Sequence, residues 1–568
     1  MIMRNLICRA LPMLRSLALC SIALCSIAEA QSKIGETIEV SIVNVDVVVT
    51  DKAGKRITGL TEKDFEIREG GKLQPISNFA EYRSDMTGGV AGVESAPGAA
   101  PAAPAEVARQ KRNVVVFVES VRLLPHQAKE MFGSIRTLLR ETIAKGDRAT
   151  IITWRTSVLV RQPFTDDLAA LDLVLDELEN ETVHGPRDTS RDVRREQSES
   201  DAADAEMAAA MGGAGTGGAG MPPIHALEAA KRQLAQIKQK THVLEALMQS
   251  ISSLDGRKVI VMAMRRFGVF AGVEYFGGEM PIERRREFET AGMHDRLIKT
   301  ANAHGITLYP VYPAGLRWDP DDASVRRELS ELTPANDLNS VLQNKIMFNE
   351  TTALSDLAEK TGGLMAWGSA NIAEMLPRVV DDLEAYYSLA YRSRTSGKDV
   401  SRDIVVKVKN SDYRVRSRKQ FVEKSDATLM NDRVIANLYQ KLEGTSFGFD
   451  VVLGEIKSTG RKRWSLPLKV RIPIAALTTL PSGAVEVGEF SVYVVSGAVV
   501  GVSSEVQHNT QSFRIPHNDL AKAKASYYTY DFTLNIDEKT DRLSVGVIDE
   551  TSKEFGLKRL ALPPRPEK

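Results

Sequence analysis

Between residues 112 and 395 the sequence alternates short apolar runs with longer amphipathic stretches, and this alternation limits the fold more than any other feature. The runs at 114–118 and 259–264 contain no polar residue. Uninterrupted runs of this length are typical of strands that are buried on both faces. Amphipathic stretches, such as the one that opens at Pro125, predict helices between the strands. We therefore expect an α/β fold of the Rossmann type, with a doubly wound and mainly parallel sheet.

The individual elements of this α/β domain can be placed approximately. We expect strands at 114–118, 149–154, 158–160, 259–264, 306–312 and 386–391, and helices at 125–143, 166–178, 224–254, 282–303, 353–360 and 372–383. Gly362 and Gly363 follow the helix predicted at 353–360, as expected for a helix end.

Regions rich in strand signals flank the α/β domain. Residues 37–83 predict a small N-terminal β unit, because valines alternate with polar residues from 43 to 47. Residues 396–422 predict a β extension packed with the α/β domain. Residues 425–568 predict a C-terminal β-sandwich, because strand-like runs and turns follow a single helix predicted at 430–442. The strands are expected at 464–472, 490–495, 527–536 and 543–548.

Two segments have the composition of linkers or insertions. Residues 84–111 are rich in alanine and proline, which predicts a flexible linker. Residues 181–223 combine a charged stretch with a glycine-rich run, which predicts a low-complexity insertion. No strand signal precedes these glycines, so a phosphate-binding loop is not expected there.

The N-terminal 30 residues resemble a secretory signal. Arginines at 4, 9 and 15 precede an apolar run at 17–27, and Ala28-Glu29-Ala30 fits a small-x-small cleavage site. We expect export to the periplasm, the cell surface or the medium. An uncleaved N-terminal anchor and a lipid anchor on Cys20 or Cys25 remain alternatives.

Removal of this signal would leave a chain without thiols. The three cysteines, Cys8, Cys20 and Cys25, all lie within residues 1–30. The mature chain then forms no disulfide, zinc–thiolate site or cysteine nucleophile. Its formal charge of about −2 gives no reason to expect a nucleic-acid partner, and no later segment predicts a transmembrane helix.

Several phrases resemble one family. Residues 43–55, with 59–67, resemble the opening of acidobacterial VWFA-related domain proteins. Residues 146–152 resemble the second strand of von Willebrand factor A (VWA) domains, and Thr361-Gly-Gly-Leu with the phrase at 383–391 resembles their late helix and strand. The resemblance covers about residues 37–422 and implies a VWA-like domain.

The family's metal-ion-dependent adhesion site places Asp-x-Ser-x-Ser after the first strand, with a Thr and an Asp from later loops. Here Glu119 and Ser120 begin that stretch, but Val121 and Leu123 replace both serines. The later stretches, 220–223 and 264–266, offer neither the Thr nor the Asp. The resemblance therefore implies a degenerate site, and we expect no bound metal or other cofactor.

Three arginines follow strands whose carboxyl ends should meet at one edge of the sheet. Arg122, Arg265 and Arg266 could form a ligand-contact patch with Glu119 that recognises a carboxylate. Alternatively, they are solvated or paired with Glu119. The acidic pair Asp381-Asp382 lies in the helix predicted at 372–383, and we interpret it as part of a solvated helix face.

No catalytic arrangement is evident in the sequence. The eight histidines form no His-x-x-x-His or His-Glu-x-x-His pattern, and no Gly-x-Ser-x-Gly motif occurs. We expect no catalytic residues and a non-enzymatic, protein-binding or scaffold role, with a partner in the envelope or outside the cell. The alternative is a hydrolase whose site is assembled from distant residues.

Overall fold

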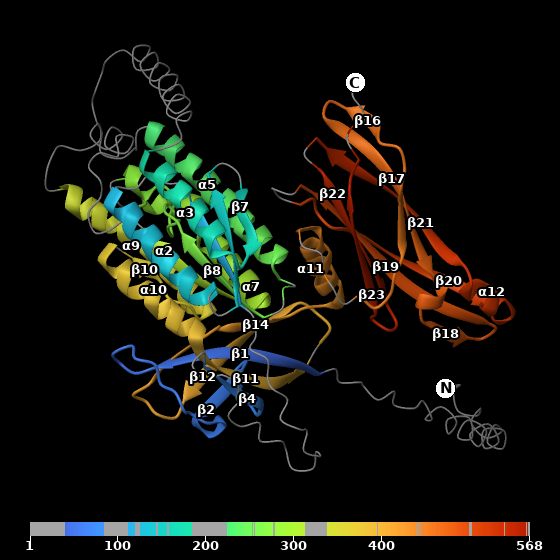
Figure 1. Ribbon diagram of the computed structural model, residues 1–568, viewed down its shortest axis with the longest axis horizontal. Helices are drawn as coiled ribbons and strands as arrows, with labels where there is room; N and C mark the ends of the chain where they lie inside the picture. Colours follow the sequence, from blue (N-terminus) through green and yellow to red (C-terminus); the bar gives the residue numbers. More distant parts are fainter. Residues whose placement is uncertain are drawn as a thin grey trace, which may run out of the picture. The chain divides into compact units, whose positions relative to one another are not determined.

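The computed structural model describes residues 40–83, 112–119, 125–143, 146–155, 158–184, 224–252, 254, 256–276, 279–312, 338–367, 369–394, 396–439, 442, 445–498, 503–538, 540–563 and 565 (Figure 1). The predicted signal (1–30), the predicted linker (84–111) and residues 185–223 of the predicted insertion lie outside these ranges. All contacts reported below lie within residues 42–392 and 397–568, which group into one unit. No helix among the described residues combines the length and the apolar character needed to span a membrane.

A six-stranded sheet with the order β10-β9-β8-β5-β6-β7 forms the α/β part of the chain. Its strands are β5 (Arg112–Glu119), β6 (Arg148–Trp154), β7 (Val158–Thr165), β8 (Arg257–Ala263), β9 (Ile306–Tyr312) and β10 (Ala366–Trp367). All neighbours pair in parallel except β7, which is antiparallel to β6. The expectation of an α/β fold with a mainly parallel sheet is confirmed.

Helices cover both faces of this sheet (Figure 1). Val114, Val116 and Val118 share a core with α2 (Pro125–Ile143), α3 (Leu168–His184) and α10 (Ser369–Glu384). Val115 and Phe117 point to the opposite face, where they join a core with α5 (Ile224–Ser250), α7 (Ala291–Ala303) and α9 (Leu338–Thr361). Strand β5 is buried along its whole length, as its uninterrupted apolar run predicts.

Two helices depart most from their expected bounds. The helix expected at 282–303 is divided into η3 (Ile282–Arg284), α6 (Arg285–Phe288) and α7. The division falls at Thr290, whose hydroxyl donates to the carbonyls of Gly268 and Val269 instead of to its own helix. Helix α9 begins well before the expected residue 353, because its mixed N-terminal half carries little periodic signal.

The N-terminal strands join strands from far along the chain. One antiparallel sheet has the order β13-β1-β11-β4, and a second has the order β14-β12-β2-β3. The bounds are β1 (Val40–Thr50), β2 (Phe65–Glu69), β3 (Lys72–Gln74), β4 (Ile76–Arg83), β11 (Ala385–Arg394), β12 (Val400–Val408), β13 (Arg414–Ser417) and β14 (Gln420–Glu423), with η1 (Glu62–Asp64) before β2. Residues from both sheets share one core. The strand expected at 386–391 therefore lies outside the parallel sheet, in β11, paired with β4.

The C-terminal region consists of two further antiparallel sheets that share a core, together with α11 (Asp426–Tyr439). Its strands are β15 (Asp450–Leu453), β16 (Lys457–Gly460), β17 (Arg463–Pro473), β18 (Thr479–Ser482), β19 (Val485–Gly497), β20 (Gln507–Pro516), β21 (Tyr527–Asp537), β22 (Arg542–Asp549) and β23 (Phe555–Ala561). Short helical segments lie between these strands at η4 (Ile474–Ala476), η5 (His517–Asp519) and α12 (Leu520–Lys524), whereas η2 (Val273–Phe276) belongs to the α/β part. The expected strands at 464–472, 490–495, 527–536 and 543–548 match β17, β19, β21 and β22.

Asp382 connects the α/β part to the N-terminal β strands. Its carboxylate accepts two hydrogen bonds from Arg416, at 2.6 and 2.7 Å, and one from Arg56 at 3.2 Å. Only 2% of Asp382 is exposed. The interpretation of Asp381-Asp382 as a solvated face is therefore wrong for Asp382, although Asp381 is exposed.

Candidate functional site

The carboxyl ends of the parallel strands bring several polar side chains to one edge of the sheet. Glu119, Trp154 and Tyr312 are the last residues of β5, β6 and β9, and Arg265 follows the end of β8 by two residues. Loops at this edge are where open α/β sheets place their ligand sites. We refer to these residues, with the residues that contact them, as the carboxyl edge.

Glu119 is held by a lysine from α5. The Lys240 Nζ lies 2.6 Å from the Glu119 Oε1 and donates to the Arg265 carbonyl at 2.8 Å. The same ammonium lies 5.1 Å from the centroid of the Trp154 ring. Lys240 is 1% exposed and Glu119 is 8% exposed, so the ion pair is shielded from water. Separating a buried pair of this kind is costly in free energy, because each charge would be left buried without a counterpart.

Lys240 was absent from the residues expected at the site, although the sequence contained a signal for it. Ile237 and Leu244, which lie three residues before and four residues after it, are fully buried. Lys240 therefore stands on the apolar stripe of an amphipathic helix. A lysine on such a stripe is rarely buried unless it is paired. The position of Lys240 on this stripe therefore indicates that it pairs with a buried acid. The helical pattern does not show which acid that is.

The second carboxylate oxygen of Glu119 is also occupied. The main-chain N–H of Arg265 donates to the Glu119 Oε2 at 2.8 Å. Donors from α5 and from the turn after β8 therefore engage both oxygens, and Glu119 connects three separate elements.

A second buried group stands beside Arg265. The side chains of Glu350 and Arg265 both act electrostatically on the hydroxyl of Tyr312. Burial raises the pKa of Tyr312, the Glu350 carboxylate raises it further, and Arg265 partly offsets the rise. Glu350 is 4% exposed. Tyr312 therefore stays protonated throughout the physiological range.

The turn after β8 is fixed by α9 and by Thr290. The side-chain amide of Asn349 accepts from the Phe270 N–H at 2.9 Å and donates to the Phe270 carbonyl at 3.0 Å. Gly268 permits this approach, because a Cβ there would lie 2.0 Å from the Asn349 Nδ2. Thr290 secures the carbonyls of Gly268 and Val269.

The structure brings together two residues of the expected contact patch. Glu119 and Arg265 meet, but through the Arg265 main chain, and the acid's charge partner is Lys240. Arg266 follows in the same turn, with a left-handed backbone (φ 51°). Arg122 and the expected degenerate stretch at Ser120, Val121 and Leu123 lie outside the described residues.

The described residues contain no group of three or more histidine, cysteine, aspartate or glutamate side chains that could hold a metal ion. At Glu119, one carboxylate oxygen accepts a hydrogen bond from the Arg265 N–H and the other lies 2.6 Å from the buried Lys240 ammonium. Glu119 alone therefore does not supply the several free oxygen ligands that a divalent cation needs.

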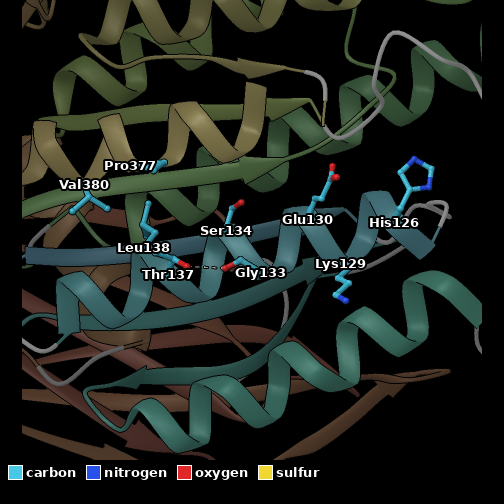
Figure 2. A pocket seen from close by; sticks show the side chains of 9 residues that line it. All are labelled: His126, Lys129, Glu130, Gly133, Ser134, Thr137, Leu138, Pro377 and Val380. Carbon is cyan, nitrogen blue, oxygen red and sulfur yellow. Dashed lines mark hydrogen bonds between the residues drawn. The ribbon is translucent and has the colours of Figure 1, made fainter. Parts of the chain in front are cut away.

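A separate groove of about 550 Å³ lies between α2 and α10 (Figure 2). Ser134 and Thr137 line it on α2, and Pro377 and Val380 line it on α10. The Thr137 hydroxyl donates to the Gly133 carbonyl within its own helix. Neither Glu119 nor the two arginines at 265 and 266 line this groove.

The chain matches no protein-family model and no curated protein. Solved structures similar to 48% of the chain include an aerotolerance-related membrane protein from Bacteroides fragilis (8% identity, 98% of that chain, TM-score 0.23) and the conserved hypothetical protein BatB from Bacteroides thetaiotaomicron (10% identity, 98% of that chain, TM-score 0.22). A third is the vWF domain of the type V pilus tip protein Mfa5 from Porphyromonas gingivalis (10% identity, 95% of that chain, TM-score 0.23). The function proposed below rests on the geometry of the carboxyl edge.

Proposed function

We propose that this chain is an exported, non-enzymatic protein-binding or scaffold protein. Its α/β part is a VWA-like domain that has lost its metal-ion-dependent adhesion site, flanked by β modules. Its partner is another protein of the envelope or the extracellular space, and contact with that partner requires no metal. The signal-like N-terminus and the family phrases in the sequence support the location and the domain type.

The observation that carries this proposal is the ion pair between Glu119 and Lys240. In a metal-dependent site, the acid at the end of the first strand has to be free to bind a cation. Here a lysine ammonium from the chain itself lies against that acid and also binds the Arg265 carbonyl. A divalent ion would have to displace a buried, hydrogen-bonded ammonium or sit beside it at a large electrostatic cost.

The test is titration of the full chain with Mg²⁺ and with Mn²⁺ by isothermal calorimetry. We expect no saturable binding, and we expect the melting temperature to be the same in EDTA and in millimolar Mg²⁺. Saturable binding at micromolar concentration would overturn the loss of the metal site. Lys240→Ala is the matched control, because only this variant exposes Glu119 to added cations.

A further inference from the structure

Strand β20 lies at the edge of a sheet in the C-terminal region. Among the described residues it pairs with β19 alone, and the register runs without a shift from Val485 opposite Pro516 to Val494 opposite Gln507. The other side of β20 therefore presents main-chain groups that no described strand engages. Such an edge can accept a further strand.

The end of the β19–β20 ladder shows which main-chain groups of β20 point outward. The His517 N–H donates to the Ala484 carbonyl at 3.3 Å, which continues the register by one pair. Because hydrogen-bonded and non-bonded pairs alternate in an antiparallel ladder, the even-numbered residues of β20 direct their N–H and C=O groups away from β19. Two observations agree with this assignment. The Thr510 and Ser491 hydroxyl oxygens lie 2.7 Å apart, as the closer side chains of a non-bonded pair allow, and Pro516, which has no N–H, belongs to the outward set.

The free edge of β20 lacks the charges that usually protect such edges. Residues 507–513 contain no aspartate, glutamate, lysine or arginine, and residues 507–510 are all exposed. Natural sheets use charged residues to prevent pairing between edges. The other described edge strands of seven residues or more carry one near their middle: Glu81 in β4, Arg161 in β7, Asp531 in β21 and Lys558 in β23.

The pattern of β20 suits pairing with its own copy. An antiparallel pair with its two-fold axis at Thr510 places residues 507–513 opposite themselves, so that outward-facing residues meet outward-facing residues. The two Thr510 residues then exchange main-chain hydrogen bonds, and Asn509 lies opposite Gln511 of the second copy. Arg514 falls outside the paired stretch, so no like charges are brought together.

We propose that two copies of this chain associate through β20, in an antiparallel strand pair centred on Thr510 that joins their sheets. A single strand pair is smaller than the interface of a permanent dimer, so the association is reversible and depends on concentration. This inference goes beyond the proposed function and does not depend on it.

The first experiment is sedimentation equilibrium of the full chain and of Thr510→Pro, from micromolar to millimolar concentration. Proline at position 510 removes an outward N–H from each copy and leaves the bonds to β19 in place. We expect a monomer–dimer equilibrium in the wild type, and a dissociation constant that is roughly tenfold or more higher in Thr510→Pro.

Thr533→Pro is the matched control on β21, the edge strand of the other sheet of the C-terminal region. The Ile474 N–H donates to the Ser526 carbonyl at 3.1 Å, which assigns the β17–β21 ladder in the same way. Thr533 is exposed, and its N–H points away from β17. Thr533→Pro should therefore associate like the wild type.

Disulfide cross-linking tests the register without proline. Thr510→Cys and Gln507→Cys are each placed in the full chain with its three cysteines changed to serine. In the proposed pair, the two Cα atoms at position 510 lie about 5.5 Å apart, within disulfide range, and those at position 507 lie about 20 Å apart. With oxidised glutathione, we expect Thr510→Cys to form a covalent dimer and Gln507→Cys to stay monomeric.

A wild type that stays monomeric at every concentration would overturn the inference. Equal loss of association in the two proline variants would also overturn it, as would cross-linking of Gln507→Cys as fast as that of Thr510→Cys. The cross-linking result decides the question even where Thr510→Pro fails to fold.

Discussion

Lys240 and Glu119 form a buried ion pair, in which the Lys240 Nζ lies 2.6 Å from the Glu119 Oε1 and both residues are shielded from water. They come from α5 and from the end of β5, and Arg265 binds both of them. The ion pair is thus the structural centre of the carboxyl edge, and it sets the position of the turn that carries Arg266.

Removal of one partner from this pair should be costly. We expect Lys240→Met to lower the free energy of unfolding by about 3–5 kcal/mol, because the Glu119 charge is left buried without its counterpart. The double variant Lys240→Met, Glu119→Gln should recover a large part of the loss. Urea unfolding of the two single variants and the double variant measures this in a double-mutant cycle. Additive effects would show that the two side chains do not depend on each other.

The ion network at Asp382 gives a second prediction. Asp382→Asn should destabilise the chain by roughly 3 kcal/mol, because Arg416 and Arg56 lose the carboxylate that they share. Asp381→Asn is the matched control, since that neighbour is exposed and its change should stay within about 0.5 kcal/mol. Chemical denaturation of both variants measures the difference. Equal effects at the two positions would contradict a specific role for Asp382.

The α/β order could be predicted from the sequence because its central strands contain uninterrupted apolar runs. Strand β5 illustrates this, since residues 114–118 are all apolar and all buried. Strand β20, which pairs with β19, was missed. Most of its side chains are polar and exposed, so its sequence shows no alternation of apolar and polar residues. The assignment of β11 to the parallel sheet failed for a different reason. Tyr387 and Leu389 are as buried as residues of a parallel strand, but sequence pattern does not identify the pairing partner.

The site shows the same division between local and long-range information. The position of Glu119 at the end of a strand follows from local pattern. Its pairing with Lys240 joins residues that are 121 positions apart, and Asp382 meets Arg56 across 326 positions. Local sequence places Lys240 on an apolar helix stripe but gives no such signal for Asp382, and only the fold shows which charges meet.

His294 gives a pH-dependent prediction. It is 3% exposed and its ring centroid lies 4.7 Å from that of Phe267. Burial lowers the pKa of His294 to about 4, against opposing effects of Asp356 and Asp295. The unfolded chain, with a histidine pKa of about 6.5, therefore binds this proton more readily than the folded chain does. Stability should be complete above about pH 6.5 and should fall as the pH drops toward 4.

The measurement is urea unfolding of the wild type and of His294→Gln at pH 7.5 and at pH 5.0. The wild type should lose about 2 kcal/mol more than the variant between these two values. The other titrating groups are common to both proteins and cancel in the comparison. An identical pH dependence of the two proteins would show that His294 is protonated as easily in the folded chain as in the unfolded one.

Two glycines allow a test of packing at the sheet. Gly363, just after α9, lies so close to β9 that an added Cβ would be 2.0 Å from the Leu308 carbonyl oxygen, which is a main-chain atom that cannot move aside cheaply. Gly363→Ala should therefore destabilise the chain by about 2 kcal/mol or more. Gly133, within α2, has no atom within 4 Å of an added Cβ. Gly133→Ala should stabilise the chain by roughly 0.5–1 kcal/mol, because alanine favours the helix. Thermal unfolding of both variants should show shifts of opposite sign, and a neutral Gly363→Ala would mean that α9 and β9 are less closely packed than described.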